Sequence, residues 1–329
     1  MTTQHDATTV IRRYDGNPVL AAADVPYPAT LIFNAGVERF QGRYVMVFRN
    51  DYGDDFHGPP KVERDTNLGL ATSDDGVHWT VEPEPIWKIR TDEERRVYDP
   101  RLTVLDGRCY ICFAMDTRHG IRGGLGVTDD LKHFEILSLS VPDNRNMVLF
   151  PERIRGRMVR LERPFPIYGR GKPEAFDIWY SESPDGRFWG DSHLVLGSEQ
   201  VPWCNCKIGP AAPPIKTDAG WLTLFHAVSK DETRPLNTWG EHPWTKTYAM
   251  GLMLLDREEP WRVIGMADGP VMMPEADYEL EGYRGSVLFP GGMIREDDGE
   301  VKIYYGAADT VECLATARLD DLLALCRPR

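Results

Sequence analysis

The sequence has 329 residues, of which 42% are hydrophobic and 27% charged, a composition typical of a globular protein. Its formal net charge of −13 argues against a nucleic-acid partner, because proteins that bind nucleic acids usually carry a basic excess. We find neither an apolar run of about 18 residues that would cross a membrane nor a basic and apolar leader, so we expect a cytoplasmic location without a membrane partner.

Five units with the same order of features follow one another along the chain. Each begins with a glycine, continues as a hydrophobic strand with a polar end, and adds a second strand, usually followed by a turn with an aromatic residue. The units cover residues 42–51 with 68–79, 107–116 with 125–134, 156–164 with 177–189, 220–226 with 250–261, and 299–309 with 313–322.

The spacing of these units predicts the fold. Successive leading glycines lie 65, 49, 64 and 79 residues apart, which fits propeller blades of about 50 residues with loop insertions. Residues 29–34 and 146–151 supply further strands, and residues 319–326 predict one short C-terminal helix. Because each two-strand unit needs neighbours to cover its faces, we predict an all-β, five-bladed β-propeller. A pair of β-sandwiches would explain the strands but not the repeated register.

One carboxylate in the second unit has unusual surroundings. The stretch Val97-Tyr-Asp-Pro-Arg-Leu102 places Asp99 between an aromatic ring and a proline, just before an apolar strand. In a pocket at the propeller axis, Tyr98 would limit the solvation of Asp99 and raise its pKa, as a general acid requires. The alternative is an aspartate that only bonds the backbone of its own turn.

Several other polar residues adjoin apolar strands. Arg49, Arg163, His226 and Asp309 occupy comparable points of units one, three, four and five, so the propeller would bring them together. Each alone also fits a salt bridge, a solvated turn or a core position. As a group, forked and point donors of this kind suit a tetrahedral dianion; the group consists of Arg145, Arg163, Lys207 and His226.

Motifs for other chemistries are missing from the sequence. It has no phosphate-binding Gly-x-x-x-x-Gly-Lys-Ser/Thr loop, no His-x-x-x-His zinc spacing and no Gly-x-Ser-x-Gly elbow. Cys109 and Cys112 fall three apart on a predicted strand and therefore point to opposite faces. We predict that the six cysteines are buried free thiols and that the protein has no metal site.

Motifs in a fixed order give the sequence its resemblance to a known family. They are Phe33-Asn-Ala-Gly, Phe48-Arg-Asn-Asp51, Tyr98-Asp-Pro-Arg101, Asn144-Arg-Asn-Met-Val-Leu-Phe-Pro151, Glu162-Arg-Pro164, Lys207-Ile-Gly, Phe225-His226 and Tyr304-Tyr-Gly-Ala-Ala-Asp-Thr310. With them the chain resembles glycoside hydrolase family 130, the inverting β-mannoside phosphorylases and their mannosidase relatives, from about residue 17 to about residue 322. The resemblance implies a five-bladed propeller, with residues 1–16 as an N-terminal extension and residues 17–329 as one catalytic domain.

The resemblance also implies a reaction and a site. Inorganic phosphate, the co-substrate, would cleave a β-mannoside and release α-mannose 1-phosphate, with no other cofactor. Asp99 would be the single catalytic acid, acting through the 3-hydroxyl of the mannose. Phosphate would bind Arg145, Asn146, Arg163, Lys207 and His226, and the mannose would bind Asn34, Arg49, Asp51, Tyr98 and Asp309.

Three questions stay open at this point. The stretches 180–185 and 188–190 resemble the family branch that acts on β-1,4-linked mannooligosaccharides, or on mannose linked to glucose or N-acetylglucosamine. The loops at 51–57 and 231–245 depart from that resemblance and leave the acceptor open. An inverting β-mannosidase, with Glu94 or Asp116 as its base, and a non-catalytic sugar-binding propeller are the alternative functions. The oligomeric state is not set by the sequence, and a homo-oligomer is compatible with it.

Overall fold

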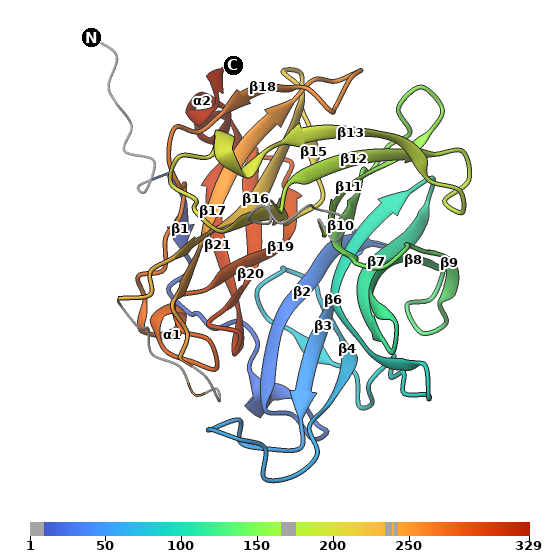
Figure 1. Ribbon diagram of the computed structural model, residues 1–329, viewed down its shortest axis with the longest axis vertical. Helices are drawn as coiled ribbons and strands as arrows, with labels where there is room; N and C mark the ends of the chain where they lie inside the picture. Colours follow the sequence, from blue (N-terminus) through green and yellow to red (C-terminus); the bar gives the residue numbers. More distant parts are fainter. Residues whose placement is uncertain (1–9, 166–175, 234–238, 240–242) are drawn as a thin grey trace.

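The computed structural model describes residues 10–165, 176–233, 239 and 243–329. Its strands form five antiparallel sheets, each the blade of a five-bladed β-propeller, so the predicted fold is confirmed (Figure 1). The first blade contains β2 (Leu31–Phe40), β3 (Arg43–Tyr52), β4 (Asp65–Ser73) and β5 (Thr80–Val81). The second contains β6 (Glu94–Leu105), β7 (Arg108–Thr117), β8 (Gly120–Thr128) and β9 (Glu135–Leu139).

The remaining blades follow in chain order. The third contains β10 (Asn144–Leu149), β11 (Met158–Pro164), β12 (Ile178–Ser183) and β13 (Gly190–Leu196). The fourth contains β14 (Lys207–Pro210), β15 (Ile215–Lys216), β16 (Trp221–Lys230), β17 (Lys246–Leu255), β18 (Val263–Met266) and β22 (Arg327–Pro328). The fifth contains β19 (Leu288–Arg295), β20 (Glu300–Ala307), β21 (Val311–Arg318) and, from the other end of the chain, β1 (Arg12–Arg13). Two helices, α1 (Asp277–Leu280) and α2 (Leu319–Leu325), and two 3-10 turns, Ala22–Asp24 and Ser198–Gln200, complete the described structure.

The recurring glycine lies in the turn between the first and second strands of a blade. Gln41 and Gly42 both have positive φ, 51° and 81°, and they join β2 to β3; Asp106 and Gly107 repeat this between β6 and β7. Two consecutive residues with positive φ form the tight hairpin turn whose twist matches that of the strands, and glycine adopts it without strain. The glycine period of the sequence is therefore a period of hairpins.

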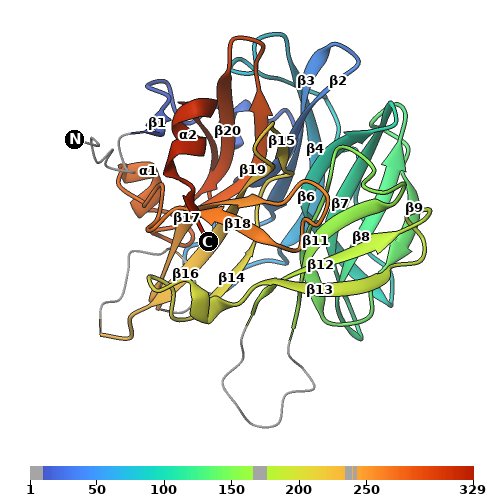
Figure 2. The same cartoon turned by 90° about the horizontal axis from the view of Figure 1, so that it is seen from above.

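Each gap between neighbouring blades has its own apolar core. Five clusters of buried side chains lie between blades one and two, two and three, three and four, four and five, and five and one. The predicted C-terminal helix is confirmed as α2, which lies beside the fifth blade (Figure 2). Its Leu319, Leu322 and Leu325 are buried in the cluster between blades four and five, and each such leucine contributes about 2 kcal/mol.

The N-terminal strand closes the ring. Arg12 and Arg13 of β1 pair with Thr316 and Ala315 of β21, and the amide of Tyr14 donates to the carbonyl of Leu314 at 2.9 Å. In Figure 1 the dark-blue β1 lies beside the red strands of the fifth blade. The stretch that the sequence set apart as residues 1–16 thus contains a strand of the last blade.

Two further features bear on the predictions. All six cysteines are free, with Cys109, Cys112 and Cys313 buried and the other three half-buried. Within the part of the chain that the structure describes, no helix has the length and apolar character needed to cross a membrane.

Candidate active site

A cavity of about 650 Å³ opens where the polar ends of the inner strands converge. All eleven side chains predicted for the site line this one cavity. They come from every blade, across more than 270 residues of sequence. The members are Asn34, Arg49, Asp51, Tyr98, Asp99, Arg145, Asn146, Arg163, Lys207, His226 and Asp309.

A repeated irregularity of the innermost strands aims three of these side chains. Asn34 on β2, Asp99 on β6 and Asn146 on β10 have φ values of 54°, 51° and 59°, in the left-handed region that is unfavourable for residues with a Cβ. In each strand the register shifts around that residue, which marks a β-bulge. Such strained positions cost about 1–3 kcal/mol each and cluster at functional sites. The bulge turns the side chain away from the strand's regular alternation and toward the cavity.

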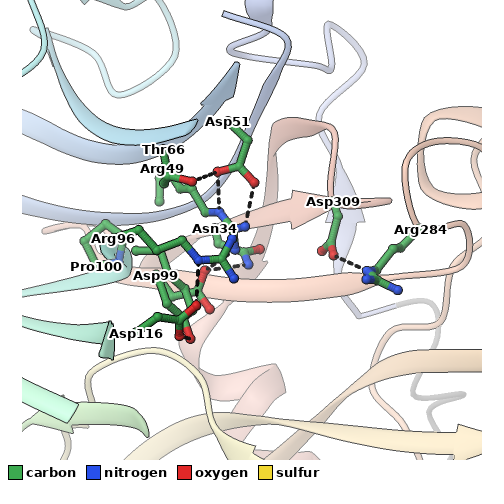
Figure 3. A network of polar contacts seen from close by, with 12 residues as sticks. Asn34, Arg49, Asp51, Thr66, Arg96, Asp99, Pro100, Asp116, Arg284 and Asp309 are labelled. Atoms are coloured by element: carbon green, nitrogen blue, oxygen red, sulfur yellow. Dashed lines mark hydrogen bonds and ion pairs between the residues drawn. The ribbon is translucent and has the colours of Figure 1, made fainter. Parts of the chain in front are cut away.

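Asp99 lies among cations rather than among apolar groups. Asn34 Nδ2 donates to Asp99 Oδ1 at 3.0 Å, and the guanidinium of Arg49 approaches the same oxygen at 3.4 Å (Figure 3). Burial alone would raise the pKa of Asp99. The charges of Arg49 and Arg101, with the Asn34 hydrogen bond and the charge of Arg145, together outweigh burial and hold that pKa below its usual value. The raised pKa expected from Tyr98 is therefore wrong for the ligand-free site, because the sequence did not show how close Arg49 and Arg101 would come.

Arg49 connects two carboxylates. Its Nε and Nη2 bond the two oxygens of Asp51 at 2.9 and 2.6 Å, and Thr66 donates to Asp51 at 2.8 Å. The guanidinium also lies over the rings of Phe33 and Tyr98, 4.5 and 5.1 Å from their centroids. Figure 3 shows this fork beside Asp99. A rigid array of donors and acceptors of this kind is suited to the hydroxyl groups of one sugar ring.

The cations on the other side of Asp99 have no carboxylate partner. Arg145, Arg163 and Lys207 form no ion pair among the described residues, although all three line the cavity. Burial, and then the charges of Arg163 and Arg145, lower the pKa of Lys207 to about 6. Burial, and then the charge of Arg145, lower the pKa of Arg163 to about 9. Like charges held together without a counterion disfavour one another, and an anion bound between them removes that cost.

His226 belongs to the same group. It is fully buried, and its Nε2 contacts Arg163 Nη1 at 3.2 Å and Asn146 Nδ2 at 3.3 Å. Since both partners are donors, Nε2 is the acceptor and the proton of the neutral ring lies on Nδ1. Burial, followed by the charges of Arg163 and Lys207, keeps the pKa of His226 well below its usual value. The ring therefore orients Arg163 and Asn146.

Asp309 faces this group from the fifth blade. It has a φ of 50°, and Arg284 Nε approaches its Oδ2 at 3.7 Å (Figure 3). Burial raises the pKa of Asp309 to about 6, with Asp99 and Asp51 adding to the rise while Arg284 and Arg49 oppose it. Near neutral pH this carboxyl can therefore exist in both protonation states.

Among the lining residues to which the sequence interpretation gave no role are Trp244, Lys246, Tyr248 and Arg284. The first three alternate from two residues before β17 into its start, and alternation is the signal that would have placed them on one face. The rings of Trp244 and Tyr248 stack at 5.9 Å, Arg284 lies 4.4 Å from the ring of Trp244, and Lys207 lies 5.3 Å from that of Tyr248. An aromatic wall with cations against it thus leads toward Lys207.

The two loops that left the acceptor open contact each other at the cavity. Phe56 and Trp244 line it, and the amide of Gly58 donates to the carbonyl of Trp239 at 2.7 Å. The rings of His57 and Trp239 stack at 4.7 Å. Of residues 231–245, positions 234–238 and 240–242 lie outside the described residues.

The bases considered for a mannosidase do not line the cavity. Asp116 accepts hydrogen bonds from Arg96 Nε and from the hydroxyl of Tyr98, both at 2.7 Å, and Glu94 is bonded within its own turn. Among the residues that the structure describes, no group of three or more His, Cys, Asp or Glu side chains is arranged to hold a metal ion.

Comparison with known proteins decides the family. The profile described as β-1,4-mannooligosaccharide phosphorylase matches residues 4–328, nearly the whole chain. The chain belongs to glycoside hydrolase family 130. The resemblance carried by its motifs is thereby confirmed. The matching profile and the curated relatives are phosphorylases, and the protein is a mannoside phosphorylase, an enzyme of the hexosyl-transferring class.

Relatives within family 130 differ in the linkage that their names give. The chain is 31% identical to β-1,4-mannooligosaccharide phosphorylase of Ruminococcus albus, over 97% of this chain and 91% of the relative. It is 26% identical to β-1,2-mannobiose phosphorylase of Listeria innocua, over 95% and 97% of the two chains. A solved structure of the Listeria innocua β-1,2-mannobiose phosphorylase with β-1,2-mannobiose superposes with a TM-score of 0.81, at 25% identity, over 96% of this chain and 98% of that one.

Proposed function

We propose that this protein cleaves β-1,4-linked mannosides with inorganic phosphate, with inversion, and releases α-mannose 1-phosphate. The observation that carries the proposal is the buried group of Arg145, Arg163 and Lys207, which lines the cavity with Asp99 and forms no ion pair among the described residues. A hydrolase would need a base to activate water, whereas phosphate is already an anionic nucleophile. The cavity supplies the cations that would hold such a nucleophile.

Each residue then has a role in the reaction. Phosphate binds Arg145, Asn146, Arg163, Lys207 and His226, while Asn34, Arg49, Asp51, Tyr98 and Asp309 hold the mannose. A phosphate oxygen attacks the anomeric carbon as the bond to the leaving oxygen breaks. The proton of Asp99 reaches that oxygen through the 3-hydroxyl of the mannose. The mannose 1-phosphate formed from hydrogen phosphate can then return its proton to Asp99, so protons and charges balance over one turnover.

Phosphate also prepares the acid. Arg49 and Arg101 favour the ionised form of Asp99, with a smaller contribution from Arg145. A bound dianion places two negative charges beside the same cations, which raises the pKa of Asp99 toward the range that a general acid needs. Protonation of the acid is thus coupled to the presence of the nucleophile, and the acid without phosphate remains mostly ionised.

The β-1,4 linkage is the finer part of the proposal. It is supported by the matching family profile and by the relative at 31% identity. Relatives named for β-1,2-linked substrates are 26–29% identical, so the difference is small. The aromatic wall of Trp244 and Tyr248 and the paired loops at the cavity are the elements that would select the linkage.

The proposal is tested by incubation of the protein with β-1,4-mannobiose and, separately, with β-1,2-mannobiose, each with and without phosphate. Mannose 1-phosphate should form only with phosphate, and faster from the β-1,4 isomer. Equal release of mannose without phosphate would reject phosphorolysis. Faster turnover of the β-1,2 isomer would reject the linkage alone.

A further inference from the structure

Two buried, ionisable side chains lie near the cavity without lining it. Arg101 is 3% exposed and Glu312 is fully buried. They hold the two ends of one peptide group: Arg101 Nη1 donates to the carbonyl oxygen of Asn34 at 3.3 Å, and the amide of Ala35 donates to Glu312 Oε2 at 3.1 Å. A donor on the carbonyl and an acceptor on the amide satisfy both ends of that peptide, while burial raises the pKa of Glu312 to about 8.

The clamped peptide belongs to the bulge that carries Asn34. Asn34 has a φ of 54°, so the segment needs external support to remain in this conformation. The backbone of the fifth blade packs closely against it: a Cβ on Gly306 would lie 2.7 Å from the amide nitrogen of Asn34, and one on Gly291 would collide with the carbonyl of Ala35. This close packing leaves the peptide little room to rotate, and Arg101 and Glu312 bond it in the orientation seen.

Arg101 joins this peptide to the segment of the acid. Its Nη1 also donates to the carbonyl of Pro100 at 2.7 Å, and its Nε donates to the carbonyl of Ala211 at 2.6 Å. One guanidinium therefore connects the bulge of β2, the residue after Asp99 and the fourth blade. Glu312, on β21, adds the fifth blade to the same network. At the end of this network, Asn34 Nδ2 donates to Asp99 Oδ1 at 3.0 Å.

We propose that Arg101 and Glu312 are positioning residues that hold the Asn34–Ala35 peptide so that the amide of Asn34 stays against Asp99. The inference rests on the proposed function, in which Asp99 is the acid. Neither residue touches the cavity, so both act through Asn34 and Asp99 and leave the phosphate-binding group in place. Glu312 acts as a hydrogen-bond acceptor, and an amide of the same shape can replace it in that role.

The experiment compares Glu312→Gln, Glu312→Asp and Glu312→Leu with a control, Glu279→Leu. Glu279 is also fully buried and acidic, but it bonds Arg13 and Tyr305, away from Asn34. Leucine at 312 leaves the amide of Ala35 unsatisfied, and aspartate is one carbon too short to reach it. We expect kcat for phosphorolysis to fall about tenfold or more in both, with KM for phosphate unchanged, and to stay within about threefold of wild type in Glu312→Gln.

A pH profile separates positioning from stability. When Asn34 no longer bonds the ionised acid, the pKa of Asp99 rises, so the alkaline limb of kcat should move to higher pH in Glu312→Asp and Glu312→Leu but not in Glu279→Leu. The inference is overturned if kcat falls as far in Glu312→Gln as in Glu312→Leu. It is also overturned if Glu312→Asp loses thermal stability as the control does while its kcat and the alkaline limb of its pH profile stay unchanged. If Glu312→Leu does not fold, Glu312→Asp decides alone. A wild-type protein that forms no mannose 1-phosphate would instead reject the proposed function.

Discussion

Phosphate binding should draw a proton onto Lys207. The pKa of this lysine is lowered to about 6, chiefly by burial and then by Arg163 and Arg145, so at pH 8 about one molecule in a hundred carries the charge in the empty site. Charging it there costs about 3 kcal/mol, which phosphate must supply from its own binding energy. Above pH 6, KM for phosphate should therefore rise by up to about tenfold per pH unit from this cause alone.

The matched variant is Lys207→Arg. Its guanidinium stays charged throughout this pH range, so binding to the variant requires no protonation of the side chain. Phosphate itself titrates in the same range, but this effect is common to both proteins and cancels in the ratio of their KM values. Initial rates on β-1,4-mannobiose at pH 6, 7 and 8 give that ratio. We expect KM of wild type relative to Lys207→Arg to rise steadily with pH, and a ratio that stays constant from pH 6 to 8 would refute the reasoning.

Three further outcomes follow from the geometry of the cavity. Asp99→Asn should lose at least about a thousandfold in kcat while its melting temperature stays close to that of wild type; comparable turnover would remove Asp99 from its role as acid. Arg163→Met should lose the stabilisation that phosphate gives to wild type, because a buried donor is missing. Its unfolding without phosphate should be no easier, since a buried cation beside Arg145 is gone; an unchanged phosphate effect in calorimetry contradicts this. Burial raises the pKa of Asp309 to about 6, so the folded state holds the proton of this carboxyl more tightly than the unfolded state does. The stability that this proton contributes is complete below about pH 4 and is lost as the pH rises through 6. Asp309→Asn should therefore be more stable than wild type by about 2 kcal/mol at pH 7.5, with little difference at pH 3.5, in urea unfolding, and equal stability at both pH values would contradict it.

The hairpin glycines explain why the fold was predictable from the sequence. A turn with two positive φ values requires glycine or a few alternatives, so the period of Gly42 and Gly107 survives in the sequence as a local signal. The motif residues were predictable for a different reason, since their order along the chain matches a family whose blades converge. Neither the glycine period nor the order of the motifs gives the distances between side chains of different blades.

That distance is what the sequence interpretation lacked. The direction of the pKa shift of Asp99 depends on Arg49 and Arg101, whose approach is set by the bulges at Asn34 and Asp99. Bulges at residues other than glycine leave little trace in composition, because asparagine and aspartate are common in ordinary turns as well. Lys246 was missed although its alternation with Trp244 and Tyr248 was present, since it lies at the start of a strand whose inner face was not known.

The pairing of β1 with β21 has a consequence for how the enzyme comes into being. Asn34 and Arg49 of the first blade are synthesised early. The fifth blade, which packs against the first, is complete only when residues near 316 have left the ribosome. Until then the apolar face that Ile32 and Phe48 share with Ile294 and Leu314 has no cover, and Asp309 is not opposite Asp99. A nascent or prematurely terminated chain can fold four blades and still lack activity, so turnover shows that the fifth blade has closed the propeller.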